Sequence, residues 1–141
     1  MKIIYKTKAI STGGRDDGKV RIENSPYEFD LVLPSKLGNS GKTGINPEQL
    51  FAAGYSACFE SALRGIARLN KIELMSASVE VEISMGKNDD GAYALAADIT
   101  AILGGIDQTQ ANTLVQQAHQ KCPYSIATRG NIEVSLSARV S

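Results

Sequence analysis

The sequence has no excess of charge of either sign, because 15 Lys and Arg residues are matched by 15 Asp and Glu residues. Nucleic acids and acidic membrane surfaces are bound through basic surfaces, so neither is expected as a partner. Long apolar runs are also missing. The longest apolar stretch, residues 50–59, is too short to span a bilayer, and the charged residues of segment 1–8 argue against a secretory signal.

The residues that usually bind zinc are scarce as well, with two cysteines and one histidine in the chain. This number is too small for a typical zinc site, so no metal is expected. Cys58 and Cys122 are too far apart in sequence to form a CxxC redox motif. A chain without a signal or a membrane span is expected in the cytoplasm, where both cysteines rest as thiols. A disulfide between them would therefore be transient or catalytic.

Hydrophobic residues make up 43% of the chain and charged residues 21%, as in ordinary globular proteins. The length predicts a single domain over residues 1–141. Alternating apolar residues and turn signals predict a meander of three short strands in the first third and three strands later in the chain. The expected strands cover residues 2–10, 20–23, 29–33, 78–85, 93–103 and 132–138.

Two helices are predicted between these strands. The first follows a loop over residues 34–45 and begins with a capping box formed by Asn46 and Gln49. The second begins at Asp107, which has the same capping pattern, and ends at Pro123. The resulting βββ-α-ββ-α-β order indicates an α+β fold with antiparallel sheets and two main helices.

Cys58 and Cys122 lie on the apolar sides of these helices, so the two thiols could meet in the interior. Free cysteines are often buried as small hydrophobic residues, and on the residues alone core packing is the favoured interpretation of both. Arg15, in a glycine-flanked loop, and Glu48, in the first helical turn, are candidates for activating a thiol. A guanidinium stabilises a thiolate. An exposed loop charge and a helix-dipole residue are the ordinary alternatives for these two.

Three segments resemble a known family. Residues 46–59, NPEQLFAAGYSACF, closely resemble the first-cysteine helix of the organic hydroperoxide resistance proteins. Residues 122–131, CPYSIATRGN, resemble their second-cysteine segment, and residues 12–16, TGGRD, resemble their arginine loop. These proteins are a branch of the osmotically inducible protein C family. The resemblance extends over residues 2 to about 138, with the three motifs in the same order.

The resemblance implies an intertwined homodimer and a thiol peroxidase that reduces organic hydroperoxides. Cys58 would be the thiol that reacts with the peroxide, and Cys122 would be the resolving thiol that closes a disulfide onto it. Arg15 would hold the Cys58 thiolate and the peroxide oxygens, and Glu48 would orient Arg15. The reductant of this family is a lipoylated protein or dihydrolipoamide. No bound cofactor is therefore expected, because the lipoyl dithiol acts from outside the chain.

Four aromatic residues near the cysteines are candidates for an apolar substrate pocket: Phe51, Tyr55, Phe59 and Tyr124. Such walls stabilise a bound alkyl or fatty-acyl hydroperoxide by about 0.8 kcal/mol per buried methylene. Hydrogen peroxide has no methylene to bury, so it gains no such binding energy. Core packing is the alternative for each ring. Two other functions remain open at this point. The chain could be a lipid or small-ligand binding module with inert cysteines, or a redox sensor that passes its oxidation to another protein.

Overall fold

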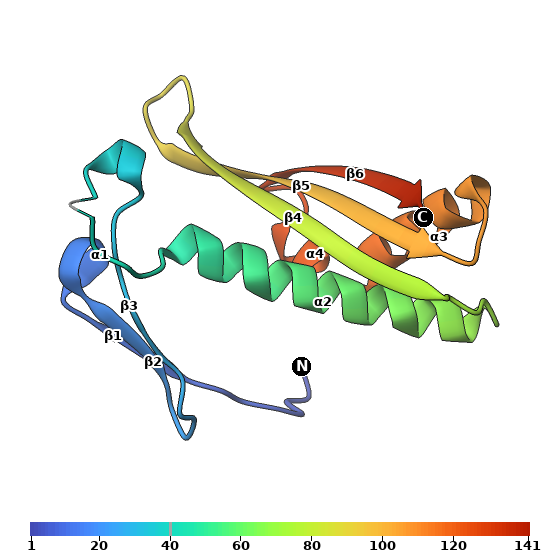
Figure 1. The fold of residues 1–141 in the computed structure, drawn as a ribbon, viewed down its shortest axis with the longest axis horizontal. Helices are drawn as coiled ribbons and strands as arrows, with labels where there is room; N and C mark the ends of the chain where they lie inside the picture. The colour runs from blue at the N-terminus through green and yellow to red at the C-terminus, as the bar shows by residue number, and fades with distance from the viewer. Residues whose placement is uncertain (40) are drawn as a thin grey trace. The chain divides into compact units, whose positions relative to one another are not determined.

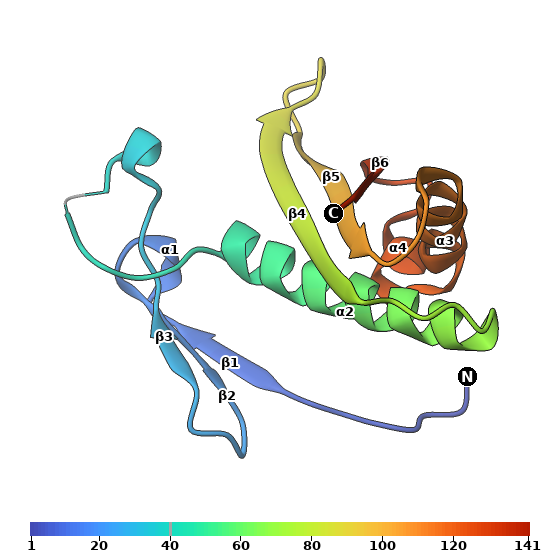
Figure 2. The same cartoon turned by 45° about the vertical axis from the view of Figure 1, so that its right-hand side comes forward.

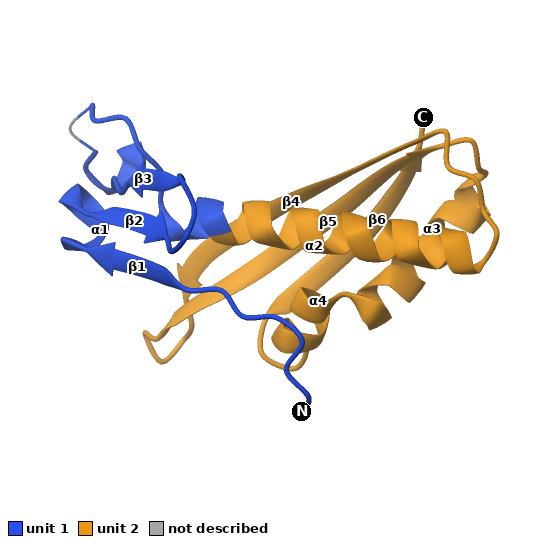
Figure 3. Ribbon diagram, turned by 90° about the horizontal axis from the view of Figure 1, so that it is seen from below, with its two compact units in different colours: residues 1–50 blue, residues 51–141 orange. Residues whose placement is uncertain are grey.

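A computed structural model describes residues 1–39 and 41–141 of the chain (Figure 1). These residues form two compact units, Met1–Leu50 and Phe51–Ser141, which Figure 3 draws in blue and orange. Each unit contains one three-stranded sheet. Helix α2 (Pro47–Leu69) begins in the first unit and continues in the second. The prediction of a single domain over residues 1–141 stays a prediction.

The first unit contains an antiparallel meander. β1 (Ala9–Thr12), β2 (Lys19–Ile22) and β3 (Glu28–Asp30) pair in this order, as predicted. The first strand is shorter than expected, because no strand is found in the described residues 1–8. The pairing with β2 ends opposite Ala9, and beyond it the Lys8 carbonyl accepts one hydrogen bond from the Glu23 N–H at 2.9 Å. An apolar pattern alone does not make a strand where no continuous ladder of hydrogen bonds forms.

The connection from β1 to β2 contains a short helix, α1 (Gly14–Asp17), where a polar turn was predicted. Gly13 and Gly14 have φ angles of 80° and 76°, in the left-handed region that favours glycine. A short 3-10 helix, η1 (Ser35–Leu37), lies in the loop predicted over residues 34–45. Residue 40 of this loop lies outside the described residues.

Helix α2 begins with the predicted capping box. Asn46 Oδ1 accepts a hydrogen bond from the Gln49 N–H at 2.8 Å, and Gln49 Oε1 accepts one from the Asn46 N–H at 3.0 Å. The helix has 23 residues, but neither it nor another helix of the described residues is apolar enough over the required length to cross a membrane. Its buried side chains recur every four residues, so one face packs into the core: Tyr55, Phe59, Leu63 and Ala67.

The second unit is a sheet with helices on one face (Figures 1 and 2). β4 (Ser76–Lys87) and β5 (Tyr93–Gly104) form an antiparallel pair, and β6 (Glu133–Val140) pairs with β5 in parallel. The prediction of antiparallel sheets is therefore wrong for the β5–β6 pair. Two helices connect these strands, and such a crossover connection returns the chain to the sheet in the same direction.

The crossover consists of α3 (Gln108–Lys121) and α4 (Pro123–Thr128). α3 begins at the predicted capping box of Asp107 and Gln110. α4 was not predicted. Pro123 does end α3, but it also occupies the first turn of α4, where a missing N–H costs no hydrogen bond. The α+β class and the order of the main elements are confirmed. The core residues of this unit are Tyr55, Phe59, Leu63, Ala67, Ala97, Ile99, Ala101, Leu103, Ala111, Leu114, Val115, Ala118 and Cys122.

Candidate active site

Cys58 and Cys122 face each other inside the second unit. Their Sγ atoms lie 3.5 Å apart, with the Cys122 thiol donating to the Cys58 sulfur. Both are free thiols, and Cys58 is partly exposed whereas Cys122 has no exposed surface. The fold thus brings together two thiols that are distant in sequence. A sulfur–sulfur bond of about 2.05 Å would require only a small movement of either side chain.

Cys122 lies between two helices, just after α3 rather than inside it as predicted. It is the C-cap of α3 and the N-cap of α4. Its N–H donates to the Ala118 carbonyl at 2.8 Å, and its carbonyl accepts from the Ile126 N–H at 3.0 Å. Cys58 lies in the middle of α2. Because both backbones are fixed by helical hydrogen bonds, the distance between the sulfur atoms depends on how α2 packs against residues 122–128.

The surroundings of Cys58 favour the neutral thiol. Burial raises the pKa of the Cys58 thiol, and the neighbouring Cys122 thiol raises it further. The backbone N–H of Tyr124, in the first turn of α4, lowers this pKa. No lysine or arginine of the second unit is among these influences. A nearby positive charge would favour the reactive thiolate, and none is among these influences.

Three of the four predicted pocket aromatics form a cluster near Cys58. The rings of Phe51 and Tyr124 stack with their centroids 6.1 Å apart, and the Tyr55 ring lies 5.8 Å from Phe51 and 5.7 Å from Tyr124. Tyr124 lies against Gly54, where an added Cβ atom would be 3.1 Å from the tyrosine hydroxyl. The absence of a side chain at Gly54 therefore lets the Tyr124 ring rest directly on α2.

Exposure divides the four aromatic residues into two groups. Tyr124 is 39% exposed and Phe51 is partly buried. Tyr55 and Phe59 have no exposed surface and belong to the core of the second unit. Contact with a substrate stays a prediction for all four. Phe51 and Tyr124 are the two rings that can make this contact without repacking of the core.

A buried hydroxyl cluster next to the cysteines was missed in the sequence. The Tyr55 hydroxyl lies 3.0 Å from Ser125 Oγ and 3.3 Å from Thr128 Oγ1. All three residues are buried. The available signal was the pair of polar residues, three positions apart, in the short segment that follows Cys122.

The charged residues of the predicted site lie in the first unit. The Arg15 guanidinium forms an ion pair with the Glu48 carboxylate, so the fold brings these two side chains together. Arg15 lies in α1, and Glu48 lies in the first turn of α2. A carboxylate in this position also interacts favourably with the helix dipole. An Arg–carboxylate contact restricts the orientation of the guanidinium.

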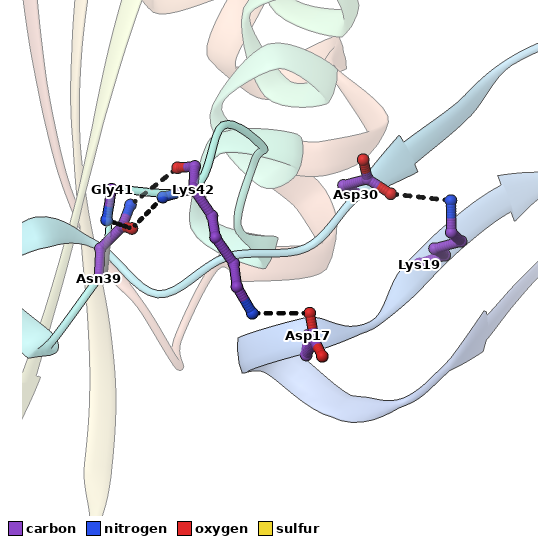
Figure 4. A network of polar contacts seen from close by, with 6 residues as sticks. All are labelled: Asp17, Lys19, Asp30, Asn39, Gly41 and Lys42. Carbon is purple, nitrogen blue, oxygen red and sulfur yellow. Dashed lines mark hydrogen bonds and ion pairs between the residues drawn. The ribbon is translucent and has the colours of Figure 1, made fainter.

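Further polar contacts anchor α1 within the first unit (Figure 4). The Lys42 ammonium forms an ion pair with Asp17 at 2.7 Å. This contact lowers the pKa of Asp17 and raises that of Lys42. Asn39 Oδ1 accepts hydrogen bonds from two backbone N–H groups of the same loop. α1 is thus held at Asp17 by the loop before α2 and at Arg15 by the first turn of α2.

Metal ligands are not clustered in the described part of the chain, which contains no group of three or more His, Cys, Asp or Glu residues able to hold an ion. The expectation that no cofactor is bound stays a prediction. The chemistry that the described residues offer is that of two thiols, an Arg–carboxylate pair and an apolar aromatic surface.

Known proteins resemble the chain over nearly its whole length. A family model described as OsmC-like protein matches residues 38–137. Organic hydroperoxide resistance protein-like 2 of Staphylococcus epidermidis is 49% identical over 134 residues, which cover 94% of each chain. OhrB, an organic hydroperoxide resistance protein of Bacillus subtilis, is 39% identical and covers 96% of this chain and 98% of its own. A crystal structure of an organic hydroperoxide resistance protein from Elizabethkingia anophelis, with thiocyanate bound, has a TM-score of 0.93 and 41% identity and covers 100% of both chains.

Proposed function

This chain belongs to the OsmC-like protein family, and we propose that it is a thiol peroxidase that reduces organic hydroperoxides to alcohols. The names of its relatives support a role in resistance to organic hydroperoxides. The observation that carries the proposal is the 3.5 Å separation of the Cys58 and Cys122 sulfur atoms. A partly exposed thiol can meet a peroxide, and a buried thiol beside it can resolve the oxidised product.

In the proposed reaction the Cys58 thiolate attacks the terminal oxygen of a hydroperoxide, ROOH. The O–O bond breaks and the terminal oxygen becomes bonded to the Cys58 sulfur. The alkoxide takes up a proton from water, which leaves Cys58 as a sulfenic acid, or the proton of the peroxide itself, which leaves a sulfenate that water then protonates. The Cys122 thiol then displaces the sulfenic hydroxyl as water, which forms a Cys58–Cys122 disulfide. The disulfide protects Cys58 from irreversible over-oxidation.

Arg15 is proposed to supply the positive charge that this reaction needs. Burial raises the pKa of Cys58, so a thiolate requires a nearby cation. A guanidinium stays protonated and therefore stabilises the thiolate and the leaving alkoxide without donating a proton. The ion pair with Glu48 would fix its orientation. This matters because misplacement of a catalytic group lowers the rate.

Phe51 and Tyr124 are proposed to form the apolar wall that receives the organic group, supported by the buried Tyr55 and Phe59. Each methylene that the wall buries contributes about 0.8 kcal/mol, a gain that hydrogen peroxide cannot make. We therefore expect a higher kcat/KM with cumene or fatty-acyl hydroperoxide than with hydrogen peroxide. Equal values for the two kinds of peroxide would contradict this part of the proposal.

A lipoyl dithiol, carried on a protein or present as dihydrolipoamide, is the proposed reductant. Thiol–disulfide exchange begins when an external thiolate attacks an accessible sulfur, and Cys58 is the more exposed of the two cysteines. The dithiol acts from outside, so the proposal includes no bound cofactor. Catalysis also requires a compartment that keeps dithiols reduced, which favours the cytoplasm.

An intertwined homodimer is the proposed assembly. The N-terminal segment exposes adjacent apolar residues, with Ile3 at 56%, Ile4 at 94% and Tyr5 at 76% of their surface. α2 also has an exposed face of small residues, which includes Ala53 and Ala57. Contiguous exposed apolar surface is typical of an interface. Light scattering is expected to give twice the chain mass of 15.0 kDa, and a monomer mass would contradict the assembly.

The test of the function is peroxide consumption with dihydrolipoamide, for the wild type beside Cys58→Ser and Cys122→Ser. Cys58→Ser is expected to consume no more peroxide than buffer, whereas Cys122→Ser is expected to react and then accumulate over-oxidised Cys58. One equivalent of cumene hydroperoxide should remove both wild-type thiols and lower the mass by about two hydrogens.

Undiminished turnover by Cys58→Ser would remove the central claim. Two other results would point to a different function. Thiols that survive the peroxide would favour a ligand-binding module, and oxidation without turnover on dihydrolipoamide would favour a redox sensor.

A further inference from the structure

A buried cluster of hydroxyl groups joins α2 to α4 beside the two cysteines. The Tyr55 hydroxyl lies 3.0 Å from Ser125 Oγ and 3.3 Å from Thr128 Oγ1. Tyr55 and Ser125 have no exposed surface, and Thr128 is 5% exposed. The reaction steps proposed above give these hydroxyls no part. Buried polar groups are costly unless they are hydrogen-bonded, so the contacts between them hold the two helices in a defined position.

One arrangement of protons uses every hydroxyl of the cluster. Thr128 Oγ1 donates to the Ser125 carbonyl at 3.2 Å, so its oxygen accepts from Tyr55. Tyr55 has a single hydroxyl proton, which this bond uses, so its oxygen accepts in turn from the Ser125 hydroxyl. Each hydroxyl donates once in this chain of bonds. Removal of the Tyr55 hydroxyl therefore breaks both of the contacts that connect α2 with α4 in this cluster.

The hydroxyl cluster and the thiol pair connect the same two segments. Tyr55 precedes Cys58 by three residues, and Ser125 follows Cys122 by three residues. Residues three apart lie on one face of a helix. The Tyr55–Ser125 contact therefore lies about one helical turn from the Cys58–Cys122 contact.

We propose that Tyr55, through Ser125 and Thr128, is a positioning residue that keeps Cys122 against Cys58 for disulfide formation. This inference rests on the proposed peroxidase function. In the step concerned, the Cys122 sulfur attacks the sulfenic sulfur of Cys58, the S–O bond breaks, and the hydroxyl leaves as water with the thiol proton. In the competing step, the sulfenic acid reacts with a second ROOH and gives a sulfinic acid and ROH.

The distances show why the position of α4 affects this competition. The sulfur atoms lie 3.5 Å apart and must approach to about 2.05 Å in a disulfide. The backbone of Cys122 is hydrogen-bonded on both sides, to Ala118 and Ile126, so its sulfur moves with the α3–α4 segment. A shift of α4 away from α2 would separate the thiols. The hydrogen bonds of the Tyr55 hydroxyl, which lie about one helical turn from Cys58, oppose this shift.

The experiment uses Tyr55→Phe, which removes the hydroxyl and keeps the ring. Wild type and variant receive increasing amounts of cumene hydroperoxide, and mass spectrometry measures the ratio of Cys58 sulfinic acid to Cys58–Cys122 disulfide. We expect a ratio at least about fivefold higher in Tyr55→Phe, because loss of even one of its two buried hydrogen bonds lowers the population of the closed thiol pair by about this factor. The rate of the first oxidation of Cys58 is followed by stopped flow in both proteins, and the product ratios are compared at equal sulfenic-acid formation, so that a change in the ratio is assigned to the step after this oxidation.

Additional variants separate positioning from general destabilisation. Thr128→Val removes a second hydroxyl at similar shape and is expected to raise the ratio, so it tests the proposal if Tyr55→Phe fails to fold. Thr128→Ser keeps the hydroxyl and is expected to retain the wild-type ratio. Ile99→Val, in the core on β5, lowers stability but removes no hydroxyl group, and it is also expected to retain the wild-type ratio.

The outcomes distinguish this inference from the function on which it rests. If wild type forms no disulfide with the peroxide, the proposed function itself fails and the positioning role falls with it. If wild type forms the disulfide but Tyr55→Phe has the same ratio of products, the positioning role alone is overturned. An equal rise in Ile99→Val would likewise overturn it, because stability would then be the cause.

Discussion

Each of the two units of the chain is stabilised internally by a different kind of interaction. The second unit has a core of buried apolar residues from α2, α3 and the sheet. In the described residues of the first unit, the buried apolar residues are Leu31 and Val32. Ion pairs show the opposite distribution: among the described residues, five join side chains within the first unit and two join side chains within the second.

This contrast gives the two groups of predicted site residues, one in each unit, different physical support. Apolar burial is the main favourable term in folding, whereas exposed ion pairs contribute little. Cys58 and Cys122 belong to the unit with the core, so their geometry is fixed by packing. Arg15 and Glu48 belong to the unit without one, so the orientation of the guanidinium depends on surface contacts. The proposed homodimer would add the apolar contacts that the first unit lacks.

The largest expected effect concerns the stability of the two units. Leu63→Ala removes a fully buried side chain from the core of the second unit and is expected to cost about 3 kcal/mol in the free energy of unfolding. Leu31→Ala, in the first unit, is expected to cost about 2 kcal/mol, at the lower end of the range for such substitutions, because few other buried apolar residues surround it there. Urea unfolding of both variants measures the difference. Equal losses would show that the first unit has a core of comparable strength.

Arg15→Gln tests the charged half of the site. If Arg15 supplies the cation for Cys58, its removal should lower kcat/KM for cumene hydroperoxide about a hundredfold. Burial would then act on Cys58 without an opposing charge, so the pKa of this thiol should rise and less thiolate should be present at neutral pH. The rate of iodoacetamide alkylation against pH measures this change, and its midpoint should move to higher pH in the variant.

The chain offers a matched control for this substitution. Arg64 also forms an ion pair with a glutamate, Glu60, but it lies on the part of α2 that belongs to the second unit. Arg64→Gln is expected to leave both kcat/KM and the alkylation midpoint within error of the wild type. A similar loss in both variants would mean that net charge, rather than the position of Arg15, sets the reactivity of Cys58.

A smaller effect is expected at Gly54, where the second unit packs an aromatic ring against a helix. Alanine is favoured over glycine in a helix by about 1 kcal/mol, but the new Cβ would lie 3.1 Å from the Tyr124 hydroxyl. The ring must move, so we expect the preference for cumene hydroperoxide over hydrogen peroxide to fall about threefold. Gly65→Ala, where the added carbon has no described neighbour within 4 Å beyond the adjacent residues and backbone of its own helix, should keep this preference. An unchanged preference in Gly54→Ala would contradict a role for the Tyr124 contact.

Sequence patterns predicted the elements that have a local signal of their own. The two helices begin at the capping boxes of Asn46 and Asp107. These starts were predictable because a capping box depends only on two residues three positions apart. The direction of β6 had no such signal, since apolar residues alternate in the same way in parallel and antiparallel strands. α4 has six residues, which are too few to display a helical period.

The candidate site was predictable to the extent that it depends on residue type. Cys58 and Cys122 were expected on inward-facing positions, but their 3.5 Å contact depends on the packing of α2 against the segment after α3. The role of Tyr55 could not be predicted from its position on an apolar helix face, because a ring that lines a pocket and a ring that bonds a buried serine give the same pattern. Its hydroxyl partners come from a helix that the sequence did not reveal.

The smallest expected effect tests whether the loss of a single surface ion pair in the first unit changes stability or activity. Lys42→Met removes the exposed pair between Lys42 and Asp17, and the urea midpoint is expected to stay within error because solvent screens such pairs. The pKa of Asp17, which Lys42 lowers, should return toward its ordinary value, and NMR titration of the carboxyl group measures this directly. Peroxide turnover should fall no more than about twofold, because the Glu48 contact still holds Arg15. A loss close to that of Arg15→Gln would instead show that the position of α1 depends on Lys42, and that the first unit is organised by single ion pairs rather than by their sum.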